Sequence, residues 1–106
     1  MSEKTTEEMI QDKGLNAPRL NPTLLESLVV SEVYHVFPGT TTTVCHLTIG
    51  NGFSVNGESA AVSIENFDVG IGRKVARDNA IDKLWPLAGI LLKNQLSETP
   101  IVFKGN

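Results

Sequence analysis

The chain has 106 residues, a formal net charge of −3 and one cysteine, Cys45. This length predicts one small domain. The negative net charge argues against binding to duplex nucleic acid, which needs a broad basic face. A single cysteine excludes a scaffold held together by intrachain disulfides. The start, MSEKTTEEMIQDKG, lacks the basic start followed by an apolar run that is typical of a signal peptide. Because the apolar stretches are also too short for a membrane span, we expect a soluble, intracellular protein.

The first part of the chain predicts a tail followed by a helix. Residues 1–18 are polar and weakly periodic, which is typical of a flexible tail, so the domain is expected over 19–96, with a loose tail at 97–106. In NPTLLESLVVSE, Asn21 is a suitable N-cap and Pro22 suits the first helical position. The leucine and valine spacing that follows predicts a helix ending near Ser31 or a little later.

The middle of the chain predicts β-structure. VYHVFPGTT indicates an extended segment before a turn, and β-rich runs flank the turn sequence Asn51-Gly52, which predicts a hairpin. Alternation in the first hairpin strand, 40–49, places Cys45, Leu47 and Ile49 on one face. The return strand is expected from Phe53 to about residue 62, and Gly57 within it indicates a bulge or a close approach by another group.

The last third predicts two helices. Asn66 and Asp68 are both candidate caps for a helix over residues 69–84, and its apolar residues form one wide face. Pro86 is expected to break or kink the run before a second helix in PLAGILLKNQL. The predicted class is α+β, with a small antiparallel sheet covered by an N-terminal helix and two C-terminal helices.

The segment GIGRKV, residues 70–75, resembles a nucleotide-binding loop only superficially. A dinucleotide fingerprint needs a preceding strand and a third small residue, and a P-loop needs Gly-Lys-Ser/Thr. A simpler anion site remains open, because the first helical turn has free N–H groups and Arg73 and Arg77 share one helix face. The alternative is a pair of salt bridges with acidic neighbours as partners, namely Asp68, Asp78 or Asp82.

No pattern of catalytic or metal-binding residues emerges. The chain lacks a Ser-His-Asp spacing and a Gly-x-Ser-x-Gly motif, and the spacing of His35, Cys45 and His46 matches no structural zinc site. We therefore expect no enzyme activity, no cofactor and no metal.

The chain resembles a family of small tailed-phage and prophage proteins named after gene products of enterobacterial phages. The resemblance covers about residues 18–92 and rests on PRLNP, FPGTT, NGF, GESA, ENFD and IGRKVARDNA. It implies a phage or prophage origin.

A weaker likeness is to the first family of Thoeris anti-defence sponges, which resembles this chain in outline. Those proteins bind cyclic ADP-ribose isomers, and some bind cyclic di- and trinucleotides. They pair an antiparallel sheet with C-terminal helices and hold phosphates with two arginines. By this likeness, Arg19 and Arg73 would hold phosphates, Phe53 would stack on a base and Asn56 would read a base edge or ribose. The interpretation of residues 70–75 as an anion site adds Arg77 to these candidate ligand-binding residues.

The resulting expectation is a phage protein that sequesters a cyclic nucleotide immune signal in the host cytoplasm without cleaving it. Its pocket would form most easily between copies of the chain, so we expect a homo-oligomer, either a dimer or a hexamer. The alternative is a phage protein that inhibits a host protein by direct binding. Whether Arg19 and Arg73 share one site stays open at this point.

Overall fold

The structure is a computed structural model that describes residues 6, 8, 9 and 19–105. The expected flexible tail, residues 1–18, lies almost entirely outside the described residues. Within 19–105 the elements are α2 (Pro22–Glu26), β1 (Val29–Val36), β2 (Thr42–Ile49), β3 (Ser54–Ala60), the 3-10 turn η1 (Ile64–Asn66) and α3 (Val69–Leu96). None of the described helices has both the length and the apolar character needed to cross a membrane.

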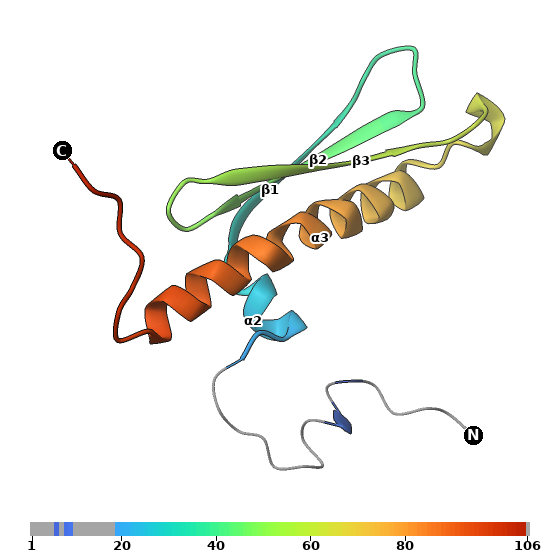
Figure 1. The fold of residues 1–106 in the computed structure, drawn as a ribbon. Coiled ribbons are helices and arrows are strands. Elements are labelled where there is room, and N and C mark those ends of the chain that lie inside the picture. Colours follow the sequence, from blue (N-terminus) through green and yellow to red (C-terminus); the bar gives the residue numbers. More distant parts are fainter. Residues whose placement is uncertain (1–5, 7, 10–18, 106) are drawn as a thin grey trace.

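The three strands form one antiparallel sheet in the order β1-β2-β3, and α3 runs along one of its faces (Figure 1). Helices packed against one face of an antiparallel sheet define the α+β class, so the predicted class is confirmed. The short helix α2 packs against α3 rather than on the sheet. In the described part of the chain, no element covers the other face of the sheet.

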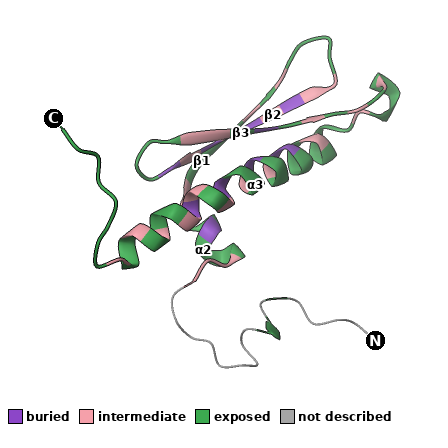
Figure 2. Cartoon of the chain, viewed as in Figure 1, coloured by how far each residue is buried: buried purple, intermediate pink, exposed green. Residues whose placement is uncertain are grey.

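The central strand β2 supplies the strand side of the core. Thr43, Cys45, Leu47 and Ile49 are buried, while the residues between them are only partly buried (Figure 2). Side chains alternate between the two faces of a strand, so the predicted alternation is confirmed. These four positions therefore mark the face on which α3 lies.

Helix α2 is shorter than the sequence predicted. Asn21 caps it as expected, since its Oδ1 accepts a hydrogen bond from the backbone N–H of Leu24 at 2.7 Å. The helix ends at Glu26, and strand β1 already begins at Val29. The β-branched residues that extended the apparent helical stripe belong to this strand, where they are favoured by their stiff side chains.

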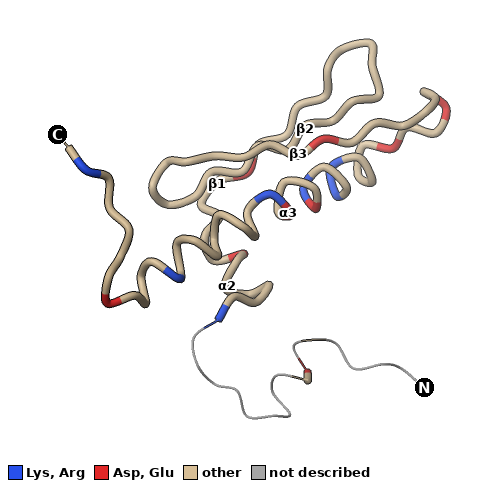
Figure 3. Tube along the Cα trace, in the orientation of Figure 1, with Lys and Arg blue, Asp and Glu red and all other residues tan. Residues whose placement is uncertain are grey.

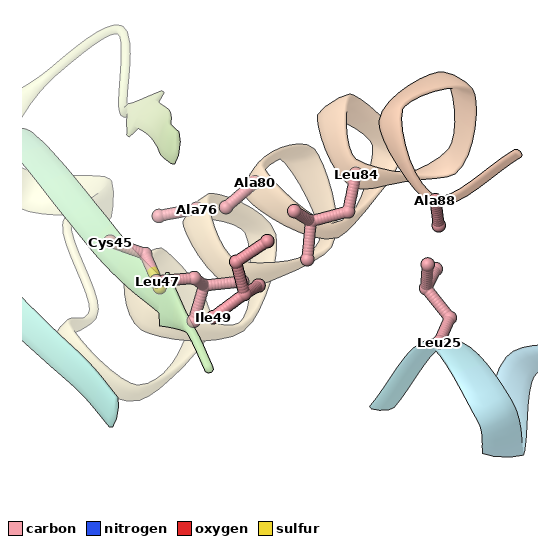
Figure 4. Packing of buried hydrophobic residues seen from close by; sticks show 8 residues of the cluster. All are labelled: Leu25, Cys45, Leu47, Ile49, Ala76, Ala80, Leu84 and Ala88. Atoms are coloured by element: carbon pink, nitrogen blue, oxygen red, sulfur yellow. The ribbon is translucent and has the colours of Figure 1, made fainter. Parts of the chain in front are cut away.

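Helix α3 is a single element of 28 residues that contains Pro86. The two helices expected on either side of this proline are therefore one. Proline removes a backbone hydrogen bond to the residue four positions earlier, here Asp82, and both positions are exposed, where water can satisfy the freed carbonyl. Packing of Leu84 and Ala88 holds the helix on both sides of the proline (Figure 4).

Small residues bring α3 very close to β3. Ala76 and Ala80 are fully buried, and a Cβ added to Gly57 would stand 2.1 Å from the backbone oxygen of Ala76. The predicted close approach at Gly57 is confirmed, and β3 pairs with β2 there without a bulge. Figure 4 shows the resulting core, with the β2 side chains facing Ala76, Ala80 and Leu84, and Leu25 of α2 facing Ala88.

The C-terminal segment is exposed but is anchored at one point. The Asn94 side chain brackets the backbone of Ile101: its Nδ2 donates to the Ile101 carbonyl at 3.1 Å and its Oδ1 accepts from the Ile101 N–H at 2.5 Å. The side chains of Ile101, Val102 and Phe103 are exposed. The two hydrogen bonds from Asn94 therefore hold the segment near the end of α3, and no strand is formed in its described residues, 97–105.

Candidate functional site

Arg77 is the centre of a charged network that joins α3 to α2 and β1. Its Nη1 and Nη2 donate to the two carboxylate oxygens of Glu26 at 2.8 and 2.7 Å, and its Nε donates to Glu32 at 2.9 Å. All three nitrogens of the guanidinium are thus engaged by carboxylates of the chain itself. The salt-bridge alternative holds for Arg77, but its partners are Glu26 and Glu32, and Asp78 pairs with Lys74 instead.

The network keeps both glutamates ionised. The hydrogen bond from Arg77 is the main cause that lowers the pKa of Glu26. The Tyr34 hydroxyl, which donates to Glu32 at 2.7 Å, is the largest cause that lowers the pKa of Glu32, followed by Arg77. Burial, and then the bond to Glu32, raise the pKa of Tyr34, so its hydroxyl remains a donor at neutral pH.

We expect the free energy of unfolding to fall in acid more steeply in the native chain than in an Arg77→Met variant. A carboxylate with a lowered pKa in the folded state adds stability above its ordinary pKa of 4.5, and this is lost as the pH falls through the lowered value. Because the two glutamates are 47% and 45% exposed, each pair should contribute about 0.5–1 kcal/mol.

Urea unfolding between about pH 7 and pH 3 measures this difference. Lys74→Met is the matched control, because it breaks an ion pair whose partners are more exposed. Parallel loss of stability in the native chain and in Arg77→Met would show that the network does not set the response to acid.

Arg73 lies one turn before Arg77 and has a different environment. Its guanidinium carbon lies 5.2 Å from the centroid of the Tyr34 ring, which is cation–π geometry. Among the described residues, no carboxylate pairs with Arg73. Figure 3 shows that the charged residues of α3 are concentrated in its first half, where Arg73 lies. It is an exposed arginine, held over an aromatic ring, with hydrogen-bond donors available for an anion.

The first turn of α3 is already capped. The Asp68 Oδ1 accepts from the backbone N–H of Ile71 at 2.8 Å, so one of the two predicted caps is confirmed. Its carboxylate occupies the position in which an anion would lie. Gly72 allows α3 to pack closely against β2, because a Cβ at this position would stand 2.9 Å from the Thr43 hydroxyl. An anion at Arg73 would therefore be bound by the side chain and not by the start of the helix.

The residue next to Arg19 packs far along α3 from Arg73. Leu20, next to Arg19, reaches the position of Gly89, where an added Cβ would stand 3.8 Å from it. Gly89 is four and a half turns from Arg73, or about 24 Å along a helix. Within one chain these two arginines do not form one site.

Phe53 and Asn56 lie on opposite faces of the sheet. Phe53 and Leu91 are among the lining of an apolar hollow of about 180 Å³ on the α3 side. Asn56 pairs with His46 across the strands, and its Oδ1 lies 2.6 Å from His46 Nδ1 on the face that α3 does not cover. One chain therefore does not assemble the predicted set of Arg19, Phe53, Asn56 and Arg73 around one ligand.

Sequence reasoning missed Tyr34, Glu26 and Glu32. The glutamates lie 51 and 45 positions before Arg77 in the chain, and no local spacing indicates that they would meet it. Strand alternation alone places Glu32 and Tyr34 on one face of β1. No described group of three or more His, Cys, Asp or Glu residues is arranged to hold a metal ion.

Comparison with known proteins places the chain among phage proteins. No curated protein and no solved structure gives a significant match. One family model matches residues 20–96, which include every helix and strand from α2 to α3. The chain therefore belongs to the phage protein (N4 Gp49/phage Sf6 gene 66) family.

Proposed function

We propose that this phage-family protein sequesters a cyclic nucleotide signal of host defence, in the host cytoplasm and without cleaving it. The signal would be a cyclic ADP-ribose isomer or a cyclic oligonucleotide. The observation that carries the proposal is Arg73, an exposed guanidinium that has no carboxylate partner in the described part of the chain and is held over Tyr34. Such a group binds a phosphate through two parallel hydrogen bonds.

Tyr34 prepares Arg73 for this role. The hydroxyl of Tyr34 is fixed by Glu32, and Glu32 is fixed in turn by Arg77. The aromatic ring is therefore held in place, and the cation–π contact restricts the arginine above it. A restricted arginine loses less conformational entropy when it binds a phosphate, which favours binding. In this proposal Arg77 positions the platform and does not contact the ligand.

In this proposal, the remaining predicted ligand residues contact the ligand from a second copy of the chain. Leu20, the neighbour of Arg19, lies against Gly89, which is about 24 Å along α3 from Arg73. A ligand that contacts both arginines would therefore lie between copies of the chain. The same applies to Phe53 and Asn56, which face opposite sides of the sheet. A homo-oligomer, a dimer or a hexamer, is thus part of the proposal.

We expect a thermal-shift screen with cyclic ADP-ribose isomers and cyclic di- and trinucleotides to identify a stabilising ligand. A ligand at 100 times its dissociation constant adds about 2.7 kcal/mol, or several degrees for a domain of this size. Arg73→Ala should remove the shift, because it deletes the phosphate contact. Lys74→Ala is the matched control: it removes an adjacent exposed charge that pairs with Asp78, and it should leave the shift intact.

The absence of a shift with every nucleotide would contradict the proposal for these signals. The alternative, inhibition of a host protein by direct binding, is favoured by the exposed apolar side chains of Ile101, Val102 and Phe103. In that case deletion of residues 100–106 should abolish binding to the host protein, and Arg73→Ala should have no effect.

A further inference from the structure

A cavity of about 350 Å³ lies on the flank of α3 opposite the Arg77 network. It is bounded by the end of β3, the η1 turn and the first turns of α3. Asn79 marks this flank, because its Nδ2 donates to the Glu58 carbonyl of β3 at 2.7 Å. Arg73, by contrast, reaches Tyr34 of β1 at the other edge of the sheet. The cavity is therefore separate from the proposed phosphate site.

The lining combines apolar walls with uncharged polar groups. Phe67, Ile71 and Val75 supply an aromatic ring and two branched side chains, and Asn66 and Asn79 supply carboxamides. Small-molecule sites have this composition, mostly apolar with a few polar groups that fix orientation. The volume is at the lower end of the usual range for such sites, which suits a ligand of nucleoside size.

The lining of the cavity offers an anion no positively charged side chain. Asp68 is the only charged residue among those that line the cavity, and no lysine or arginine does. One oxygen of Asp68 is already bound by the Ile71 N–H, and the positive end of the helix offsets its charge. A phosphate would meet a carboxylate there with no cation to balance it. The lining therefore favours an uncharged ligand.

Several polar groups at the cavity have hydrogen-bonding capacity to spare. Asn79 uses its Nδ2 on Glu58, which leaves its Oδ1 as an acceptor, and the Asn66 side chain makes no hydrogen bond to the described residues. Behind the cavity wall, the Oγ1 of the fully buried Thr43 has no partner among the described residues, and it lies against Gly72, which lines the cavity.

We propose that this cavity binds an uncharged heteroaromatic ring of the nucleobase type. The ring would lie against Phe67, Ile71 and Val75, and its polar edge would bond to the carboxamides of Asn66 and Asn79. A carboxamide offers one acceptor and two donors in a plane, which matches the alternating donors and acceptors of a base edge. The site needs no phosphate, so it stands independently of the function proposed for Arg73.

The test is a titration of the native chain with adenosine, guanosine, cytidine and uridine, followed by the backbone amide signals in NMR. At least one nucleoside should shift the amides of Ile71, Gly72 and Asn79 in a saturable way. Ile71→Trp should lower the affinity for that nucleoside by about tenfold or more, because the larger ring fills the cavity. Ile90→Trp is the matched control, since Ile71 and Ile90 lie on the same helix and are 66% and 63% exposed.

A second variant tests the proposal independently, in case Ile71→Trp also affects folding. Asn66→Ala removes an exposed carboxamide that makes no hydrogen bond to the described residues, and it should weaken binding by about fivefold. Arg73→Ala should leave nucleoside binding unchanged, which separates this site from the phosphate site. The proposal is overturned if no nucleoside shifts the cavity amides, or if Ile71→Trp and Asn66→Ala bind as tightly as the native chain.

Discussion

Gly57→Ala should destabilise the fold by about 3 kcal/mol or more, at or above the upper end of the usual range for overpacking. The added Cβ would stand 2.1 Å from the backbone oxygen of Ala76 and 2.1 Å from the backbone nitrogen of Ala80. These are backbone atoms of a helix, so they cannot rotate aside as the end of a side chain can. Helix α3 would have to move away from β3, which would loosen the core beneath it. Urea unfolding followed by circular dichroism measures the loss.

Gly50→Ala is the matched control for this prediction. Gly50 lies in the turn between β2 and β3, and an added Cβ there meets nothing within 4 Å. The same chemical change should therefore alter the free energy of unfolding by less than about 0.5 kcal/mol. If the two variants unfold at the same urea concentration, α3 does not approach β3 as closely as described.

The close packing of α3 also positions the candidate phosphate site. Gly57, Ala76 and Ala80 allow the helix to lie almost in contact with the sheet. At this separation the side chains of Arg73 and Arg77 reach Tyr34 and Glu32 on the far edge strand, β1. We therefore expect larger residues at the contact to displace both arginines as well as the core.

The features that local sequence determines were predicted well. The hairpin follows from Asn51-Gly52 between two β-rich runs, and the buried face of β2 follows from simple alternation. Gly57 within a strand indicated a close approach, and Asp68 indicated a cap. Each of these conclusions depends on residues within a few positions of one another.

The boundaries that depend on tertiary packing were not predicted. The stripe of leucines and valines after Pro22 fits a helix as far as Ser31, but pairing with β2 draws Val29 and its successors into β1. Pro86 normally ends a helix, yet α3 continues because the residues on both sides of it are packed in the core. In both places a long-range contact outweighed local preference.

The candidate site was predicted only in part. Helical spacing placed Arg73 and Arg77 on one face, which the structure bears out, since both face β1. Spacing alone did not indicate that Arg77 would bind Glu26 and Glu32. Nor did it indicate that Arg73 would lie over Tyr34 without a carboxylate partner among the described residues. Nor could it place Arg19, because the contact of Leu20 with α3 at Gly89 depends on how α2 packs.

Leu84→Ala should cost about 3 kcal/mol of stability. Leu84 is 2% exposed, belongs to the core cluster, and lies between Ala80 and Ala88 on the buried side of α3. Truncation removes three carbon atoms from the core and leaves a cavity that a small domain can fill only partly. Buried leucines lose about 2–5 kcal/mol on this change. Urea or thermal unfolding measures the effect.

Leu96→Ala is the matched control, because Leu96 lies on the same helix but is 52% exposed. Alanine is a slightly better helix former than leucine, and Leu96 is the last residue of α3, so the change in helix propensity is small in both variants. The difference between them therefore reports burial against the sheet and α2. We expect Leu96→Ala to change the free energy of unfolding by less than about 1 kcal/mol. If Leu84→Ala were as mild, residues 80–88 would not be packed against the core, and the explanation given for the continuity of α3 through Pro86 would fail with it.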